Sequence, residues 1–364
     1  MSDTIAKTRT LPQKNTRQSN LELLRILATL FVVIVHYNNT GSGKAFLYAD
    51  DMPLHYEILL IFEMLAICAV NIFVMISGYF LCTSTHVKIS KIALLYIDVI
   101  AISVLRYSLY CLMGETTFDP TAFLYRFIPL NWYVAVYTGL YLLSPYLNQI
   151  IKDKNISQFR FMLLIFFFVL SVWPSGVEFL SKALDFSPDS LSPISNQGSS
   201  DGYTLVNFIL LYLLGAYFRL YSNKAPSTRK IIYALFVYLG CTILNTIYAN
   251  FFFGRAASYC NPLVIIQTVA IFVIFQNLSI RSKAINSIAS CSFGVYLMHS
   301  FFFRFCQIER FVTGNPLLIP VHIILSALLI YAASALIYRV YKKLFNPVFN
   351  IVEKKLCSLG YDVA

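Results

Sequence analysis

The sequence contains few charged residues. Only 12% of its 364 residues are Asp, Glu, Lys or Arg, about half of the roughly 25% that soluble globular domains carry. Hydrophobic residues make up 58% of the chain. This shortage of charge excludes an ordinary water-soluble enzyme of two or three domains and indicates a polytopic membrane protein.

Several local patterns are also missing. The eight cysteines form no C-x-x-C pair and lie mostly within apolar segments, so we predict small buried hydrophobic residues and no metal site. No small-residue cleavage site follows the first apolar segment, which we therefore interpret as a retained span and not a signal peptide. We detect no internal repeat.

The apolar segments predict an all-α integral membrane fold of about ten transmembrane helices, since about 20 residues span a bilayer. The expected spans are residues 20–38, 56–82, 91–113, 131–151, 159–174, 203–221, 230–253, 261–280, 288–306 and 316–341. We expect a basic tail at 1–18, a transmembrane domain at 19–341, a second tail at 342–364 and no appended soluble domain. Residues 174–202, rich in Ser, Pro and Asp, predict an exposed outer loop, either a connector or a lid.

The distribution of Lys and Arg predicts the topology. Twenty of the 28 fall in the two tails and in alternate loops, which places both termini in the cytosol under the positive-inside rule. Six fall on the opposite side: Lys44, Arg126, Lys182, Arg255, Arg304 and Arg310. This bias explains the net charge of +11 without a nucleic-acid partner.

Two polar residues stand on the first apolar helix. In RILATLFVVIVH, Arg25 and His36 are eleven positions apart, close to three helical turns, so both side chains face the same way about 16 Å apart along the axis. A cation near the cytosolic end and an imidazole deeper in the helix suit a long substrate with an anionic head and a reactive far end. Alternatively, Arg25 reaches the lipid interface and His36 lies near the outer headgroups.

Five segments in order resemble the acyltransferase 3 family of integral-membrane O-acyltransferases, over about residues 19–341. They are R-x10-H at 25–36, AVNIFVMISGYFL at 69–81, LNWYVAVYTGLYLLSPYLN at 130–148, LLYLLGAYF at 210–218 and SFGVYLMHSFF at 292–302. The resemblance implies transfer of an acyl group, often acetyl, from cytosolic acyl-CoA to a hydroxyl of a surface glycan or its lipid-linked precursor. Acyl-CoA would be a substrate, and no bound cofactor is expected.

With this resemblance, Arg25 is predicted to hold a donor phosphate and His36 to act as general base. Lys88 and Lys91 replace an R-x-x-R pair of the family, so they either bind phosphate or are ordinary inner-loop charge. Ser77 and Gly78 either form a donor-side turn or serve helix packing.

Trp132 and Tyr133 are either interface aromatics or the walls of an acyl or sugar pocket. His299 matches the late histidine of the family and is either a pocket residue or a core histidine. Glu63 and Asp98 are buried carboxylates, and we hypothesise that one of them orients His36.

The main alternative is a transporter or flippase for a lipid-linked sugar, for which no matching half-repeats are found. A scaffolding membrane protein is a further alternative, but it gives no reason for Arg25 and His36 to share a face. The expected location is a bacterial inner (plasma) membrane, with membrane lipid, acyl-CoA and a glycan as partners. The sequence does not give the oligomeric state.

Overall fold

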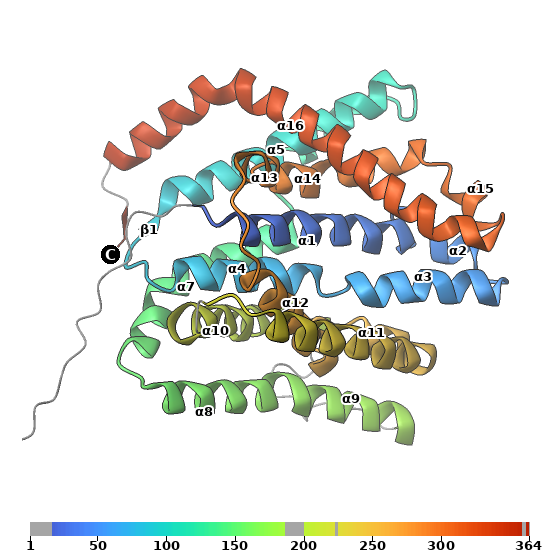
Figure 1. Ribbon diagram of the computed structural model, residues 1–364. Coiled ribbons are helices and arrows are strands. Elements are labelled where there is room, and N and C mark those ends of the chain that lie inside the picture. The colour runs from blue at the N-terminus through green and yellow to red at the C-terminus, as the bar shows by residue number, and fades with distance from the viewer. Residues whose placement is uncertain (1–16, 186–199, 223–224, 359–361, 364) are drawn as a thin grey trace, which may run out of the picture.

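The computed structural model describes residues 17–185, 200–222, 225–358 and 362–363, and its helices run roughly side by side (Figure 1). The longer helices are α1 (Ser19–Asn38), α3 (Pro53–Ala66), α4 (Ala69–Leu81), α5 (Ile89–Leu112), α7 (Trp132–Lys152), α8 (Ile156–Phe167), α9 (Trp173–Leu184), α10 (Leu205–Tyr221), α11 (Thr228–Ala256), α12 (Pro262–Gln276), α14 (Ser292–Phe302) and α16 (Ile319–Ser358). The shorter ones are α2 (Ala45–Tyr48), α6 (Pro120–Tyr125), α13 (Lys283–Ala289), α15 (Ile308–Val312), η1 (Phe168–Val172), η2 (Ser200–Gly202), η3 (Phe303–Phe305) and η4 (Pro316–Leu318). Two short strands, β1 (Val87–Lys88) and β2 (Asp362–Val363), pair antiparallel.

Six helical stretches of the described chain are long and apolar enough to cross a membrane. They are Ser19–Asn38, Pro53–Leu81, Ile89–Leu112, Ile156–Leu184, Thr228–Ala256 and Pro316–Leu356. The all-α, multi-pass membrane fold predicted from the sequence is therefore confirmed. All ten predicted segments overlap helices of the structure, but the count of ten spans stays a prediction.

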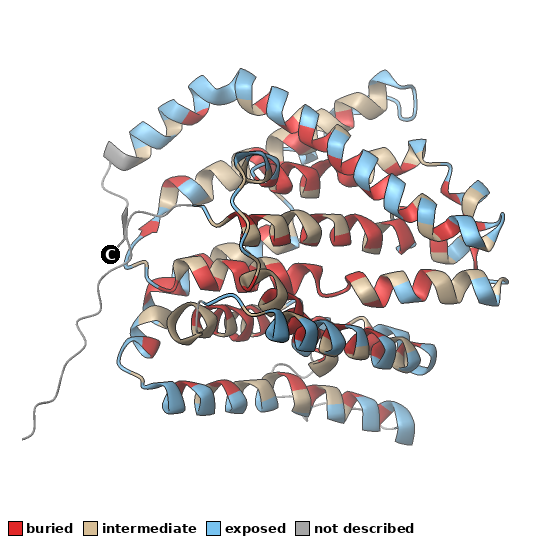
Figure 2. Ribbon diagram, in the orientation of Figure 1, coloured by how far each residue is buried: buried red, intermediate tan, exposed pale blue. Residues whose placement is uncertain are grey.

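Helix α1 lies at the centre of the bundle. It packs against α3, α4, α12, α13, α14 and α16, and Figure 2 shows that its residues are mostly buried, whereas α8 and α9 expose one face. Polar side chains on α1 therefore face protein and not lipid, which is the usual environment of charged groups in membrane helices. This position makes α1 the natural place for a site.

The second apolar segment breaks between α3 and α4, and neighbouring helices bind the backbone there. The Gln267 amide donates to the carbonyl of Met64 at 3.0 Å, and the Tyr238 hydroxyl donates to that of Leu65 at 2.6 Å. In an apolar environment an unpaired carbonyl is costly, so a helix break needs such partners. These contacts hold α11 and α12 against the break.

The prediction of a loop at residues 174–202 is wrong for the first part of this segment, because α9 remains helical to Leu184. Pro174 directly follows the π-helical turn η1 and Trp173, within a helical stretch that runs without a break from Ile156 to Leu184. The proline therefore does not end the helix. Residues 186–199 of the predicted loop lie outside the described residues.

The pairing of β1 with β2 brings the end of the described chain to the end of the bundle where α1 begins (Figure 1). The location of both chain termini in the cytosol stays a prediction. Most of the predicted basic tail, residues 1–16, lies outside the described residues. The predicted tail at 342–364 is largely a continuation of α16, which is helical to Ser358.

Helices α4 and α10 approach each other closely through two glycines. A Cβ atom added to Gly78 would lie 2.1 Å from the backbone oxygen of Tyr212, and one added to Gly215 would lie 2.1 Å from that of Met75. Small residues at such crossings allow tight packing in membrane proteins. This contact supports the packing alternative for Gly78.

We expect Gly78→Ala to destabilise the protein by about 1–3 kcal/mol, because the methyl group overpacks the α4–α10 crossing. The matched control is Gly240→Ala, since no atom lies within 4 Å of a Cβ added there. Thermal unfolding in detergent, followed by the loss of monodisperse protein, measures both variants. Equal melting temperatures for Gly78→Ala and the wild type would contradict the close approach.

A second contact, an ion pair, joins α5 to α16. Lys342 Nζ lies 2.8 Å from both carboxylate oxygens of Asp98, and the hydroxyls of Tyr338 and Tyr341 donate to the same carboxylate at 2.8 and 3.1 Å. The carboxylate is buried, with only 4% of its side chain exposed. Asp98 is thus fully engaged by α16.

We expect Asp98→Asn to lower the free energy of unfolding by about 1–3 kcal/mol. This loss is smaller than that for breaking a fully buried ion pair, because 35% of the Lys342 side chain is exposed. The double variant Asp98→Asn/Lys342→Met should regain part of this loss, since it removes the unpaired cation. Thermal unfolding of the two variants measures the difference. A double variant no more stable than Asp98→Asn would show that the ion pair is not the source of the loss.

Candidate functional site

Arg25 and His36 both face the interior of the bundle, and each lines a cavity. Arg25 lines a cavity of about 320 Å³, here the arginine cavity, and His36 lines one of about 490 Å³, here the histidine cavity. Because α1 is helical from Ser19 to Asn38, the three-turn spacing predicted from the sequence holds. Tyr296 of α14 lines both cavities, so they are neighbours with this residue between them.

A pair of histidines lies in the histidine cavity. The rings of His36 and His299 are 4.7 Å apart between centroids, edge to face. Nδ1 of His36 lies 2.9 Å from the carbonyl oxygen of Val32, and Nδ1 of His299 lies 2.7 Å from that of Tyr296. A carbonyl only accepts hydrogen bonds, so each Nδ1 carries the proton and each Nε2 presents a lone pair.

The two Nε2 atoms are the basic atoms of this cavity. The Nε2 atom of His299 is buried and has no hydrogen-bond partner in the structure. A buried imidazole nitrogen with an unused lone pair is able to accept a proton from a hydroxyl group within reach. Of the two alternatives for His299, the structure therefore supports the pocket residue.

Helix α7 supplies the next wall of the cavities. Asn131 caps α7 by accepting a hydrogen bond from the N–H of Val134, and its side-chain oxygen also accepts one from the Tyr296 hydroxyl at 3.1 Å. Trp132 lines the histidine cavity and Tyr133 the arginine cavity. The structure thus places both predicted aromatics at cavities and not solely at a lipid interface.

Arg25 shares its cavity with Ser77, Tyr133 and Arg17. Its guanidinium donates to Glu22 at 2.6 Å, one turn earlier on α1. A guanidinium has five N–H donors, so this ion pair fixes the side chain and leaves donors for a further anion. Arg25 and Ser77, both candidates for donor binding, therefore line the same cavity, and their roles in binding stay predictions.

Neither predicted carboxylate partner is brought to His36. Asn38 donates to Glu63 at 2.9 Å, and because two residues turn a helix by about 200°, Asn38 and Glu63 lie on the side of α1 away from His36. Asp98 is bound by Lys342. The hypothesis that Glu63 or Asp98 orients His36 is corrected here, since the carbonyl of Val32 holds the ring.

The remaining predicted donor residues lie elsewhere. Lys88 precedes α5 and Lys91 lies in its first turn, with its Nζ 5.9 Å from the centre of the Tyr141 ring. Neither lysine lines the arginine cavity, nor does Gly78. Their roles in binding stay predictions.

Three cavity residues were not predicted. Tyr296 and Asn131 line the histidine cavity, and Arg106 does so from α5. The sequence offered two signals: Tyr296 and His299 are three residues apart on one helix face, and Asn131, a residue type favoured as an N-cap, is the first residue of the predicted span 131–151. Within the described ranges, no group of three His, Cys, Asp or Glu side chains is suited to a metal ion.

The arrangement therefore combines a cation at one end of α1 with a pair of proton-accepting imidazoles three turns away. No curated protein and no solved structure matches the chain significantly. A family model described as an acyltransferase domain matches residues 18–339. Since this match covers nearly the whole chain, the protein belongs to the acyltransferase 3 family and is a membrane acyltransferase.

Proposed function

We propose that the protein is an O-acyltransferase that moves an acyl group, most simply acetyl, from cytosolic acyl-CoA to a hydroxyl of a cell-surface glycan or its lipid-linked precursor. The observation that carries this proposal is that the arginine and histidine cavities are neighbours that share Tyr296 in their walls. Two reactants entering from opposite ends of α1 would meet there. The proposed location is a bacterial inner membrane, where both acyl-CoA and glycan precursors are available.

The arginine cavity suits the donor. CoA has an anionic phosphate head and a narrow arm that ends in the thioester, and guanidinium groups bind phosphate in a bidentate manner. Arg17 and Arg25 line this cavity, whose volume of about 320 Å³ is near the lower limit for ligand pockets. We infer that it takes the arm, with the phosphates at the arginine end.

The histidine cavity suits the acceptor hydroxyl. In the proposed step the hydroxyl oxygen attacks the thioester carbonyl carbon while its proton passes to Nε2 of His36. The carbon–sulfur bond then breaks, and the thiolate takes this proton, so that the products are an ester and free CoA. Direct transfer is favoured over an acyl-enzyme, because among the described residues no Ser or Cys side chain is hydrogen-bonded to His36.

The first test is transfer of label from radioactive acetyl-CoA to the surface glycan of the host in membrane vesicles. We expect His36→Ala to lower kcat by about 10²–10⁴-fold, the usual contribution of a general base. His86→Ala is the matched control, because His86 is exposed and lines none of the cavities. Equal turnover of His36→Ala and His86→Ala, with both proteins inserted and folded, would reject His36 as the base.

The role of Arg25 is tested with the same assay. We expect Arg25→Ala to raise KM for acetyl-CoA by about 10-fold or more with kcat largely preserved, because the lost contact is made equally in the ground and transition states. Arg25→Lys should recover only part of the affinity, since lysine lacks the bidentate fork. An unchanged KM in Arg25→Ala would remove the donor role.

The identity of the donor is tested with a panel of short acyl-CoA thioesters. Label in the glycan with any one of them supports the transferase. Absence of label with all of them, while the wild-type protein moves a lipid-linked sugar across the vesicle membrane, would favour the transporter alternative.

A further inference from the structure

We propose that the protein binds an anionic group of its acceptor, a carboxylate or a phosphate, in a basic cavity next to the histidine cavity. This cavity, here the outer cavity, has a volume of about 830 Å³ and is lined by Lys44, Arg106, Arg304 and Arg310. That the ligand is the acceptor rests on the proposed function. The anion site itself rests on the contacts described below.

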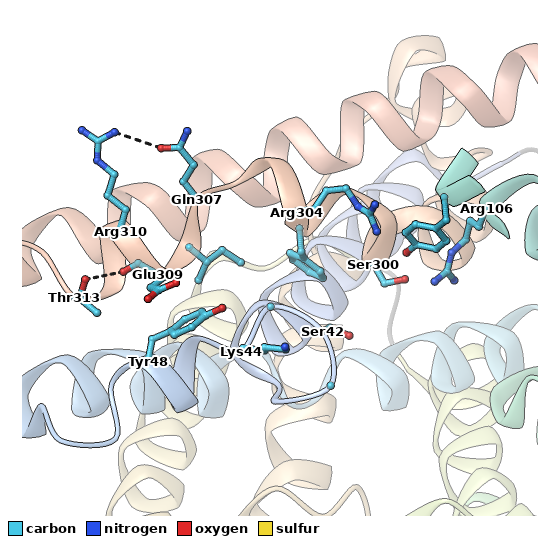
Figure 3. Close-up of a pocket in the computed structure, with 15 residues that line it drawn as sticks. Ser42, Lys44, Tyr48, Arg106, Ser300, Arg304, Gln307, Glu309, Arg310 and Thr313 are labelled. Atoms are coloured by element: carbon cyan, nitrogen blue, oxygen red, sulfur yellow. Dashed lines mark hydrogen bonds between the residues drawn. The ribbon is translucent and has the colours of Figure 1, made fainter. Parts of the chain in front are cut away.

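The outer cavity is built from three parts of the chain. Figure 3 shows Ser42 and Lys44 on the loop after α1, facing the segment that carries Ser300 and Arg304, with Arg106 of α5 beyond Ser300. Ser42, Arg106 and Ser300 line both the outer and the histidine cavity. The two cavities are therefore adjacent, and one ligand could occupy both.

Positive charge exceeds negative charge around these two cavities. Their linings contain the side chains of Lys44, Arg106, Arg126, Arg304 and Arg310 but, among acidic residues, only Glu309. Glu115, from outside the lining, forms an ion pair with Arg304. In the part of the chain that the structure describes, the other four cations form no ion pair. An anionic ligand would supply the missing charge.

Arg106 gives the clearest indication of an anion-binding site. Among the described residues, its buried Nε has no hydrogen-bond partner, and its guanidinium donates only to the carbonyl of Leu297, at 3.3 Å. By contrast, Asp98 and Arg25, two other charged residues on membrane helices, form ion pairs with Lys342 and Glu22. A guanidinium within a membrane helix is costly without a counter-ion, so Arg106 is poised for an anion that the chain itself does not provide.

The topology supports the same conclusion. Positive residues on the outer side work against correct insertion of a membrane protein, and the sequence places only six there. Four of these six line the outer or the histidine cavity: Lys44, Arg126, Arg304 and Arg310. A fifth, Arg255, is paired with Glu178. Outer cations thus gather where an acceptor would enter.

An anion held at Arg106 would place the adjoining neutral part of the acceptor in the histidine cavity. Trp132 lines this cavity together with His36, and a flat indole ring is a suitable surface for a sugar. The anion has two chemical sources, the phosphate of a lipid-linked precursor and the carboxylate of an acidic sugar. Both would be recognised by the same cations, so binding experiments must separate them.

Trp132 also offers a direct readout of binding. The chain has two tryptophans, so Trp173→Phe leaves Trp132 as the single reporter. This protein, in nanodiscs of zwitterionic lipid and without any acyl donor, is titrated with four probes. They are inorganic pyrophosphate, farnesyl pyrophosphate, a hyaluronan tetrasaccharide carrying carboxylates, and the uncharged chitotetraose.

We expect saturable changes in Trp132 fluorescence with anionic probes, weakened by added salt. Arg106→Gln should raise the Kd about tenfold, the effect of losing one charged hydrogen-bonding group. Lys44→Gln, which changes an exposed residue of the outer cavity, should raise the Kd by a smaller factor and serves if Arg106→Gln does not fold. The matched control Lys182→Gln changes an exposed outer cation that lines neither cavity and should leave the Kd unchanged.

The probes separate the two sources. Saturation by the pyrophosphates alone assigns the anion to a lipid-linked phosphate, and saturation by hyaluronan alone assigns it to an acidic sugar. The proposal is overturned if chitotetraose binds as tightly as the anions, if neither Arg106→Gln nor Lys44→Gln weakens binding, or if no anionic probe saturates. Because no acyl donor is present, saturable anion binding in a protein that transfers no acyl group would reject only the proposed function.

Discussion

A polar group within a membrane bundle must find its partner in the protein, because the lipid offers none. Most of the architecture follows from this constraint. The carbonyls freed between α3 and α4 accept hydrogen bonds from Tyr238 and Gln267, and Asn38 binds Glu63 across α1 and α3. These contacts tie helices that are distant in sequence, so the pairing of polar groups also fixes how the bundle is assembled around α1.

Among the described residues, some buried polar atoms have no partner, and two of them lie at the histidine cavity. Nε2 of His299 and Nε of Arg106 are buried without partners, and both residues line the histidine cavity. A buried polar atom without a partner is costly, and at a cavity a bound ligand is able to supply that partner. Asp98, by contrast, has both carboxylate oxygens bound by Lys342, so it is not available to a substrate.

The sequence was sufficient for the features that depend on one helix. The spacing of Arg25 and His36 predicted their common face, and the apolar segments predicted the helices of the bundle. The partners of buried carboxylates could not be predicted, because they depend on which distant helix lies opposite. Lys342, for example, follows Asp98 by 244 residues. The spacing of Tyr296 from His299 indicated a shared helix face, but that Tyr296 lines two cavities depends on how distant helices pack around it.

The division of the site into two cavities has a consequence for the chemistry. Arginines stand at both ends, Arg25 in the arginine cavity and Arg106 at the border of the outer cavity, whereas the residues between them, Val32, Tyr296 and the two histidines, carry no fixed charge. In the proposed reaction both substrates would be held by their anionic parts, far enough apart to limit mutual repulsion. The thioester and the hydroxyl, both neutral, would then meet where the dielectric constant is low. There a transient imidazolium would interact strongly with the negative charge that develops on the thioester oxygen. The arginines would thus supply the affinity for the two substrates, and the histidines between them would carry out the acyl transfer. A site with charged ends and an uncharged centre is therefore consistent with the proposed reaction.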